Sequence, residues 1–352
     1  MSSVRKIASA ILPKSLKRIL RNPNKGMEDL FFRGYNDFLK TGSTPHESFV
    51  AMVDLYAATN GEFIDSVNKK IRKLNPASSV PSVIDGIIGS YSARDFDVVN
   101  NELNRDGYSH FEKRLSPEFC KKLYDFAMRT PATVPPDYKD KILYDPAKPV
   151  AGVYRLDRQD IINNPEVQEL VMDPVLINIA RNYLECEPIF DYPAMWWSPA
   201  FSKEASGEAA QLYHFDLDRI KWLKLFIYVN DVTPENGPHC YIKGSHRAGN
   251  KPAELLKRGY ARIPDSDLKT HYKETDFVMA CAPAGSIFAG DTKCWHKSNH
   301  VSKGHRLVLE FEYTGSMFGA NYPKLKIKKA ASKLAGFSKM NKVYCSNMFF
   351  DN

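Results

Sequence analysis

The feature that most constrains the fold is a series of short apolar runs in the second half of the chain, separated by turn residues. Residues 222–229 and 306–313 are the clearest of these runs, and the loops around them carry Asn236, Gly237, Pro238 and Gly285. Short strands punctuated in this way are typical of antiparallel sandwiches and jelly rolls. Weaker runs cover residues 195–199, 212–216 and 286–289. The sequence therefore predicts an α+β protein with a jelly-roll core.

Helical patterns precede and interrupt these strands. Residues 27–39 and 48–74 mix apolar and charged side chains at helical period, and residues 78–82 are the best linker candidate. Ser116 and Pro117 predict the start of a helix that runs to residue 129, and residues 165–183 predict another. We therefore expect flanking helices around the core.

These patterns divide the chain into four parts. We expect a basic amphipathic segment at residues 1–26, a helical extension at 27–94, the jelly-roll domain at 95–320 and a basic tail at 321–352.

Basic residues are concentrated at the two ends of the chain. The net charge is +8, but residues 1–27 hold seven basic residues and no acid, and residues 321–352 hold seven lysines and one aspartate. A nucleic-acid reader would more usually carry a basic face on its folded core, so we expect no nucleic-acid partner. The basic and apolar N-terminal segment suits peripheral membrane contact. Packing of that segment on the body of the protein is the simpler alternative, and an organellar transit peptide is a third.

The cysteines indicate a reducing compartment. All six are scattered without a Cys-x-x-Cys pair, which argues against a disulfide scaffold. The N-terminal apolar stretch is interrupted by Pro13 and Lys14, unlike a signal peptide, and the sequence has no run of about 18 apolar residues. We expect a cytoplasmic protein, peripheral to a membrane if the N-terminal segment binds one. The sequence does not indicate an oligomeric state.

Three residues have the pattern of a metal site. His214 and Asp216 lie two apart in a strand-like run, so their side chains point to the same face. His296 follows the strand-like run at 286–289 and can supply a third ligand. Two imidazoles and one carboxylate on one face of an octahedral ion leave open positions, as in non-haem Fe(II) oxygenases. The sequence therefore predicts a metal site formed by His214, Asp216 and His296.

Arg306 is the candidate anchor for a co-substrate. Two open metal positions suit the keto-acid end of 2-oxoglutarate, whose distal carboxylate then needs a fixed cation. Arginine offers a planar fork for a carboxylate, and Arg306 begins a strand ten residues after His296. A lone His-x-Asp pair is a weak signal, but the order His-x-Asp, His, Arg is far more specific.

At this point the sequence resembles the phytanoyl-CoA dioxygenase family over residues 95–315. The resemblance is carried by the metal-site residues and Arg306 together with turn motifs: Asp106-Gly107-Tyr108, Asn230-Asp231, Glu235-Asn236-Gly237-Pro238, Lys243-Gly244-Ser245-His246 and Gly290-Asp291. It implies a cupin-like, double-stranded β-helix fold. It also implies dependence on Fe(II), 2-oxoglutarate and O2, with ascorbate as an additional reductant.

The reaction implied by the resemblance is hydroxylation of an unactivated carbon of a small or medium organic substrate, with release of succinate and CO2. Desaturation, cyclisation and epimerisation on the same fold remain alternatives. A catalytically silent metal-binding interaction module and a zinc hydrolase are alternatives from other classes. Related halogenases carry a small residue where this chain has Asp216, so halogenation is not expected.

The resemblance also places Met195 at a 2-oxoglutarate contact, with Trp197 on the same strand face. Among other candidates, His246 is expected in a turn or at a helix start. His239, His300 and His305 are expected near the mouth of the site, more in loop or surface roles than as ligands. Tyr154 and Arg155 are candidates for substrate contact.

Overall fold

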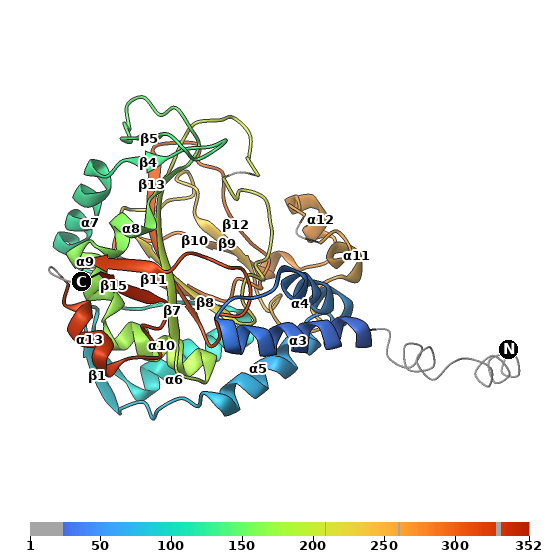
Figure 1. Cartoon of the computed structure of the whole chain (residues 1–352). Helices are drawn as coiled ribbons and strands as arrows, with labels where there is room; N and C mark the ends of the chain where they lie inside the picture. The colour runs from blue at the N-terminus through green and yellow to red at the C-terminus, as the bar shows by residue number, and fades with distance from the viewer. Residues whose placement is uncertain (1–23, 208, 260, 329–331, 352) are drawn as a thin grey trace, which may run out of the picture.

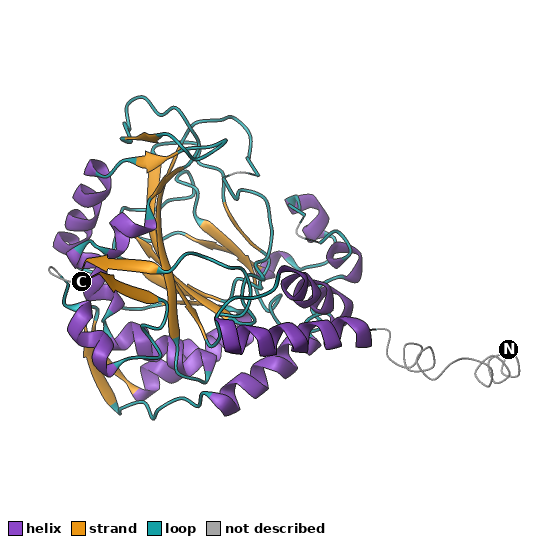
Figure 2. Cartoon of the chain, viewed as in Figure 1, coloured by secondary structure: helices purple, strands orange, loops and turns teal. Residues whose placement is uncertain are grey.

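The computed structural model describes residues 24–207, 209–259, 261–328 and 332–351. Two antiparallel sheets form its centre, and helices surround them (Figures 1 and 2). The larger sheet has eight strands in the order β3-β11-β8-β13-β7-β6-β4-β5, and the smaller has the order β10-β9-β12. This is the predicted jelly roll, a cupin-like double-stranded β-helix with flanking helices.

The strands of these two sheets are β3 (Tyr108–His110), β4 (Ala132–Thr133), β5 (Lys141–Ile142), β6 (Tyr154–Leu156), β7 (Ile189–Pro199), β8 (Trp222–Tyr228), β9 (His239–Ile242), β10 (Phe277–Ala280), β11 (Ile287–Gly290), β12 (His296–Ser298) and β13 (His305–Thr314).

Strand β13 shows how side-chain alternation builds the barrel. Its register places Arg306 opposite Ser198 on β7 and Glu310 opposite Phe226 on β8. The apolar side chains at positions 307, 309, 311 and 313 belong to the main hydrophobic core. Successive strand residues face opposite sides, so Arg306, Glu310 and Glu312 face the interior between the two sheets. A polar interior is thus lined by one face of a strand whose other face is buried in the main core.

Helices and connecting segments complete the fold: α3 (Lys25–Thr41), α4 (His46–Thr59), α5 (Glu62–Leu74), α6 (Ala93–Asp106), α7 (Pro117–Arg129), α8 (Arg158–Ile162), α9 (Pro165–Val171), α10 (Pro174–Leu184), α11 (Ala253–Leu256), α12 (Asp265–Lys269), the 3-10 turn η1 (Glu274–Asp276) and α13 (Leu334–Met340). Two short strand pairs lie outside the barrel: β1 (Val83–Gly86) with β2 (Gly89–Ser92), and β14 (Leu325–Lys328) with β15 (Met348–Asp351). Within the described ranges, no helix is both long enough and apolar enough to span a bilayer.

Helices α6, α7, α9 and α10 cover the outer face of the eight-stranded sheet. Their apolar residues, such as Leu103, Leu123 and Ile179, share one core with Leu225 and Leu309 of the sheet. The predicted start at Ser116 is confirmed, since its side chain accepts a hydrogen bond from the Phe119 amide. This layer holds the back of the large sheet.

Helices α3 to α5 cover a second core beside the small sheet, on one side of the barrel (Figure 1). Tyr56 of α4 packs against Phe215, with ring centroids 5.6 Å apart, and Phe215 packs edge-on against Trp295 at 4.9 Å. Phe215 lies between His214 and Asp216, and Trp295 precedes His296. The N-terminal helices therefore pack directly behind the predicted metal-site segments.

Three details differ from the sequence-based expectations. The helix expected at 165–183 is divided into α9 and α10, because Pro174 lacks an amide hydrogen and Asp173 caps the second helix. The helical region at 48–74 is divided at Asn60 and Gly61, which both have left-handed backbone conformations. Residues 212–216 are extended but form isolated bridges rather than a longer strand.

The C-terminal segment is packed on the domain. Leu325, Ile327 and Leu334 are fully buried, and the Tyr344 hydroxyl donates a hydrogen bond to the Val171 carbonyl at 2.6 Å. Its exposed lysines Lys326 and Lys328 alternate with the buried residues of β14. The basic segment predicted at 1–26 lies, up to residue 23, outside the described residues.

Candidate metal centre and active-site cavity

His214, Asp216 and His296 meet between the two sheets. Each offers one ligand atom, and these atoms all lie within 4.8 Å of one another. Asp216 Oδ1 is 3.9 Å from His214 Nε2, and Asp216 Oδ2 is 3.6 Å from His296 Nε2. The structure thus brings together the three residues predicted as metal ligands.

Backbone pairing sets this geometry. His214 and His296 form an antiparallel bridge in which each amide donates to the other's carbonyl, at 3.0 and 2.9 Å. The Asp216 amide donates to the Thr292 carbonyl at 2.8 Å. Backbone hydrogen bonds therefore fix His214 and His296, 82 positions apart in the sequence, side by side.

The imidazoles are oriented for coordination through Nε2. His214 Nδ1 lies 3.0 Å from the Leu212 carbonyl, and His296 Nδ1 lies 3.0 Å from the Cys294 carbonyl. Because a carbonyl only accepts, each Nδ1 carries the proton and donates it, which leaves each Nε2 with a free lone pair. This tautomer is the one a metal ligand needs.

The protonation states also suit a cation. Burial, with a smaller contribution from the charge of His296, lowers the pKa of His214 to about 3. Burial likewise lowers the pKa of His296. Burial alone would raise the pKa of Asp216, but Lys224 and the two histidines hold it well below its usual value. Neutral imidazoles and an ionised carboxylate bind a divalent metal without first losing protons.

Lys224 links the metal-site carboxylate to two further acids. Its Nζ lies 3.2 Å from Asp216 Oδ2, 3.4 Å from Glu310 Oε1 and 2.8 Å from Glu312 Oε1. Burial opposes its charge, yet the three carboxylates hold the Lys224 pKa well above its usual value. Glu312 is fully buried, and burial together with repulsion from Glu310 raises its pKa. The ion pair with Lys224 therefore holds Asp216 Oδ2 in place.

Arg306 is fully buried, and its hydrogen-bond partner Ser298 lines the cavity into which the metal-site residues open. Its guanidinium donates to the Gly237 carbonyl and to Ser298 Oγ, the latter at 2.8 Å, while its Nε has no partner. No carboxylate of the described residues lies within 4.0 Å of it. Burial lowers its pKa, although arginine remains charged at any ordinary pH. A buried cation with an unused donor fits the carboxylate of a bound co-substrate.

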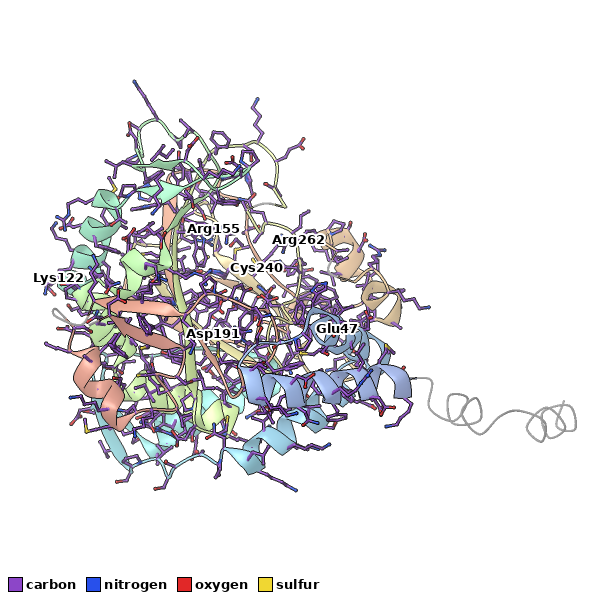
Figure 3. The ribbon with its side chains drawn as sticks, viewed as in Figure 1. Glu47, Lys122, Arg155, Asp191, Cys240 and Arg262 are labelled. Atoms are coloured by element: carbon purple, nitrogen blue, oxygen red, sulfur yellow. The ribbon has the colours of Figure 1, made fainter. Side chains whose placement is uncertain are left out.

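The metal-site residues open into a cavity of about 330 Å³. Polar and charged side chains dominate its wall: Arg155, Arg158, Tyr192, His214, Asp216, Lys224, His239, Arg262, His296, Ser298, Glu310 and Glu312. Arg155 comes from β6 and Arg262 from the loop before α12 (Figure 3). A second hollow of about 260 Å³ adjoins it, and Val153 and Ala209 line both.

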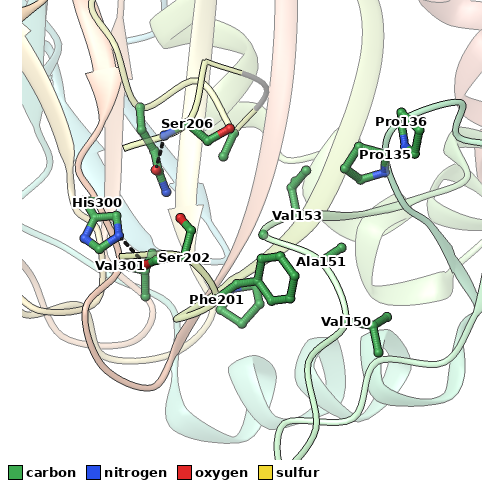
Figure 4. A pocket seen from close by; sticks show the side chains of 14 residues that line it. Pro135, Pro136, Val150, Ala151, Val153, Phe201, Ser202, Ser206, His300 and Val301 are labelled. Atoms are coloured by element: carbon green, nitrogen blue, oxygen red, sulfur yellow. Dashed lines mark hydrogen bonds between the residues drawn. The ribbon is translucent and has the colours of Figure 1, made fainter. Parts of the chain in front are cut away.

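The second hollow is mainly apolar. Pro135, Val150 and Phe201 contribute to its wall, and His300 lies at its edge, where its Nε2 donates to the Ser202 carbonyl at 2.8 Å (Figure 4). Phe201 is 54% exposed although it is a large apolar residue. The polar cavity and the apolar hollow are therefore neighbours with opposite character.

The β7 side chains predicted to contact the co-substrate, Met195 and Trp197, lie on the face of the strand that packs in the main core. Trp197 does not line the cavity; it packs in the main core against Tyr144 and His305, with ring centroids 4.6 and 5.2 Å away. Met195 borders the cavity, but its side chain shares the face of Trp197 and is buried in the same core. Trp196, one residue along, lines the cavity instead. The strand assignment holds, while the tryptophan assigned to the site faces away from it.

Other expected residues are distributed differently. His239 is 3% exposed and lines the cavity, so a loop or surface role is wrong for it. Tyr154 is buried in the core, where its hydroxyl accepts a hydrogen bond from the Val150 amide at 2.6 Å. Arg155 does reach the cavity. His305 contacts Tyr124 Oη through Nε2 at 3.2 Å.

Sequence reasoning missed Lys224, Glu310 and Glu312, although the signal was present. Glu310 and Glu312 share the strand parity of Arg306, so the same alternation that placed Arg306 in the interior also placed them there. Lys224 is a charged residue within an otherwise apolar strand, which is costly unless it is paired.

A jelly roll with two histidines and one carboxylate converging between its sheets defines the class of cupin-like proteins with a candidate metal centre. The family model for phytanoyl-CoA dioxygenase matches residues 103–308, more than half of the chain. The chain belongs to the phytanoyl-CoA dioxygenase family, as the resemblance in its sequence indicated.

Individual relatives are distant. Ectoine dioxygenase from Sphingopyxis alaskensis is 24% identical over 246 residues, which cover 64% of this chain and 76% of that protein. Among solved structures, HygX from Streptomyces hygroscopicus, with nickel and 2-oxoglutarate bound, is 16% identical, with a TM-score of 0.46 over 64% of this chain and 87% of that one. EctD from S. alaskensis in its apoform is 19% identical, with a TM-score of 0.46 over 68% and 82% of the two chains.

Proposed function

We propose that this protein is an Fe(II)- and 2-oxoglutarate-dependent dioxygenase that hydroxylates an unactivated carbon of a small or medium organic substrate, releasing succinate and CO2. The observation that carries the proposal is the convergence of His214, Asp216 and His296 in one cavity beside the buried Arg306. Two imidazoles and a carboxylate with open positions suit iron that must also bind a co-substrate and O2.

Each residue has a defined task in this proposal. His214 and His296 present Nε2 and Asp216 presents a carboxylate oxygen to Fe(II), while Arg306 and Ser298 bind the distal carboxylate of 2-oxoglutarate. The bound iron and co-substrate together supply the oxidising chemistry. The protein orients them, excludes bulk water and positions the substrate carbon. Ascorbate serves as an additional reductant.

Desaturation, cyclisation and epimerisation are other outcomes of the same chemistry, and product mass distinguishes most of them from hydroxylation. Hydroxylation adds one oxygen atom, whereas desaturation removes two hydrogens. A catalytically silent metal-binding module is the alternative from another class. The complete ligand set, the free Nε2 atoms and the unused donor of Arg306 favour an enzyme.

The first test is succinate formation and O2 uptake by anaerobically purified protein supplied with Fe(II), ascorbate and 2-oxoglutarate. Slow turnover is expected even without substrate, and Asp216→Ala is the control that removes it. If neither turnover nor iron-dependent binding of 2-oxoglutarate is found, the silent-module alternative replaces the enzyme.

We also propose that residues 95–320 form the oxygenase domain, which carries every residue assigned to the chemistry, and that residues 1–26 act only in localisation, through contact with an acidic membrane surface. Removal of residues 1–26 is then expected to leave succinate formation unchanged and to reduce binding to vesicles that contain anionic lipid. Equal vesicle binding by the full and shortened chains would refute the membrane role.

A further inference from the structure

Three arginines in the wall of the active-site cavity have no acidic partner. Arg155, Arg158 and Arg262 all line it, and no carboxylate of the described residues lies within 4.0 Å of any of them. By contrast, Arg181 and Arg219, whose side chains are 16% and 1% exposed, are each held by a carboxylate, at 3.0 and 2.6 Å. Arg155 and Arg262 are exposed, and exposed arginines outside the cavity such as Arg129 also lack a carboxylate partner among the described residues. What distinguishes this group is that three cations without such a partner line one cavity.

Arg158 shows an unmet hydrogen-bonding need. Its Nη1 is buried and has no partner among the described residues. Its guanidinium lies over the rings of Tyr192 and Tyr322, 4.7 and 5.4 Å from their centroids, which fixes its plane without satisfying its N–H groups. A buried donor without an acceptor is unfavourable, so an acceptor supplied by a ligand would stabilise this arrangement.

Arg155 and Arg262 bring like charges to the same cavity. Burial lowers the pKa of Arg262, and the charge of Arg155 lowers it further, while Asp216 opposes both effects. Arg155 otherwise contacts only the ring of Tyr138, at 5.5 Å, among the interactions described for its side chain. Like charges that approach one another are stabilised by an anion between them.

The acids of the cavity do not neutralise these arginines. Glu310 and Glu312 face Lys224, and Asp216 is shared between Lys224 and the two histidines. The carboxylates are thus gathered on one side of the cavity, around Lys224 and the metal-site residues.

We propose that the substrate is a small organic acid, whose carboxylate, phosphate or sulfate group is held by Arg155 and Arg262 with Arg158 as a third donor. That this bound acid is a substrate rests on the proposed function; that the arginines bind an anion does not. The cavity of about 330 Å³ must also hold the co-substrate, so the acid is small, and its remaining part lies between the arginines and the metal-site residues.

Inorganic sulfate is the first probe. Full-length protein loaded with Ni(II) and N-oxalylglycine, so that the Arg306 position is filled, is titrated with sulfate by calorimetry at constant ionic strength. Saturable binding at one site is expected, weakened about tenfold or more in the Arg155→Gln, Arg262→Gln double variant. Arg258→Gln is the matched control, because Arg258 is an exposed arginine paired with Asp267 outside the cavity. Absence of saturable binding, or equal binding by the double variant, would overturn the proposal.

Matched organic probes then test the chemical class. 3-Phenylpropionate is compared with 3-phenylpropionamide, which has a similar shape but no charge, and phenyl phosphate is compared with both. The acids are expected to bind about tenfold more tightly than the amide, and the double variant is expected to lose this preference. The stronger of the two acids identifies carboxylate or phosphate as the favoured group. Equal or tighter binding of the amide would overturn the proposal and would indicate selection by the apolar hollow.

The proposed function and the arginine site can be refuted separately. If the protein takes up neither Ni(II) nor N-oxalylglycine, the proposed function fails. The sulfate titration is then repeated on metal-free Arg306→Met protein, in which the other anion site is removed. Sulfate binding that depends on Arg155 and Arg262 in that protein would support the arginine site alone, and its absence would overturn it.

Discussion

The two sides of the active-site cavity differ in whether their charged side chains have ion-pair partners. Around the metal-site residues, Lys224 contacts three carboxylates within 3.4 Å, so the charged groups there are held by partners inside the protein. At Arg155, Arg158 and Arg262, the described residues provide no carboxylate partner. Paired charges keep ligand atoms in place before binding, whereas unpaired charges are available to what binds. The first side is built to hold a cofactor and the second to select a molecule.

Removal of a proposed metal ligand is expected to have the largest effect on the metal-site side of the cavity. Asp216→Ala leaves two imidazoles and no anionic ligand, so we expect iron affinity to fall at least about a hundredfold and succinate formation to disappear. Calorimetric titration with Ni(II) and a succinate assay measure the two effects. Normal activity in this variant would contradict the site assignment, and His214→Ala should behave in the same way.

Arg306→Ala tests the buried cation next. The variant leaves the distal carboxylate of 2-oxoglutarate without its buried partner, so we expect the 2-oxoglutarate concentration for half-maximal turnover to rise on the order of a hundredfold. Iron binding should change little, because Arg306 does not touch the metal-site residues. Arg306→Lys should recover part of the loss, and an unchanged 2-oxoglutarate requirement would refute the role.

Lys224→Met sharpens the comparison, because it converts the paired side into a group of unpaired acids. Asp216, Glu310 and Glu312 would then repel one another, and we expect metal affinity to fall about 10- to 100-fold, as for other residues that orient a ligand. Lys221→Met is the matched control. Lys221 is also a buried lysine, but it lies outside this cavity and donates to the Tyr183 carbonyl at 2.9 Å. Equal metal affinity in both variants would show that Lys224 does not position Asp216.

The smallest expected effect concerns pH. Burial and the charge of Arg306 lower the pKa of His239 well below its usual value. Near pH 6.5 the His239 side chain therefore takes up a proton in the unfolded chain but stays neutral in the folded protein. The contribution of His239 to the free energy of unfolding is therefore complete above pH 6.5 and is lost as pH falls. His239→Gln should reduce the acid sensitivity of metal-free protein by about 1.4 kcal/mol per pH unit below 6.5. Urea unfolding at pH 5.0 to 7.5 measures it; identical pH slopes would contradict the assignment.

The convergence of the proposed metal ligands and the buried position of Arg306 could be predicted from sequence because short-range rules bear on them. Two-residue spacing puts His214 and Asp216 on one face, and strand alternation puts Arg306 on the face opposite to Leu307 and Leu309. The same rule does not say which face is the interior, and on β7 the phase was assigned to Trp197 instead of Trp196. β7 has large apolar residues on both faces, and its polar residues Asp191 and Ser198 lie at opposite parity, so the pattern of the strand alone does not say which face is the interior.

Long-range features were out of reach for a different reason. The contact of Lys224 with Glu310 and Glu312 depends on the register between β8 and β13, which side-chain patterns within one strand do not set. The isolation of Arg155 and Arg262 depends on how the nearby acids pair, since Asp157 contacts Lys141 and Asp265 contacts Lys297. Both features depend on contacts between different segments, and the sequence of a single strand or loop does not specify such contacts.

The packing of Phe215 between Tyr56 and Trp295 has a consequence for how this protein can be shortened. The family match begins at residue 103, after helices α3 to α5 have ended. A chain begun there would lose the contact of Tyr56 with Phe215, which in turn packs on Trp295, and Phe215 and Trp295 are each the immediate sequence neighbour of a residue assigned to the metal. Helices that contribute no side chain to the chemistry would thus decide whether the ligands keep their spacing, and the smallest working unit of this enzyme is larger than its family signature.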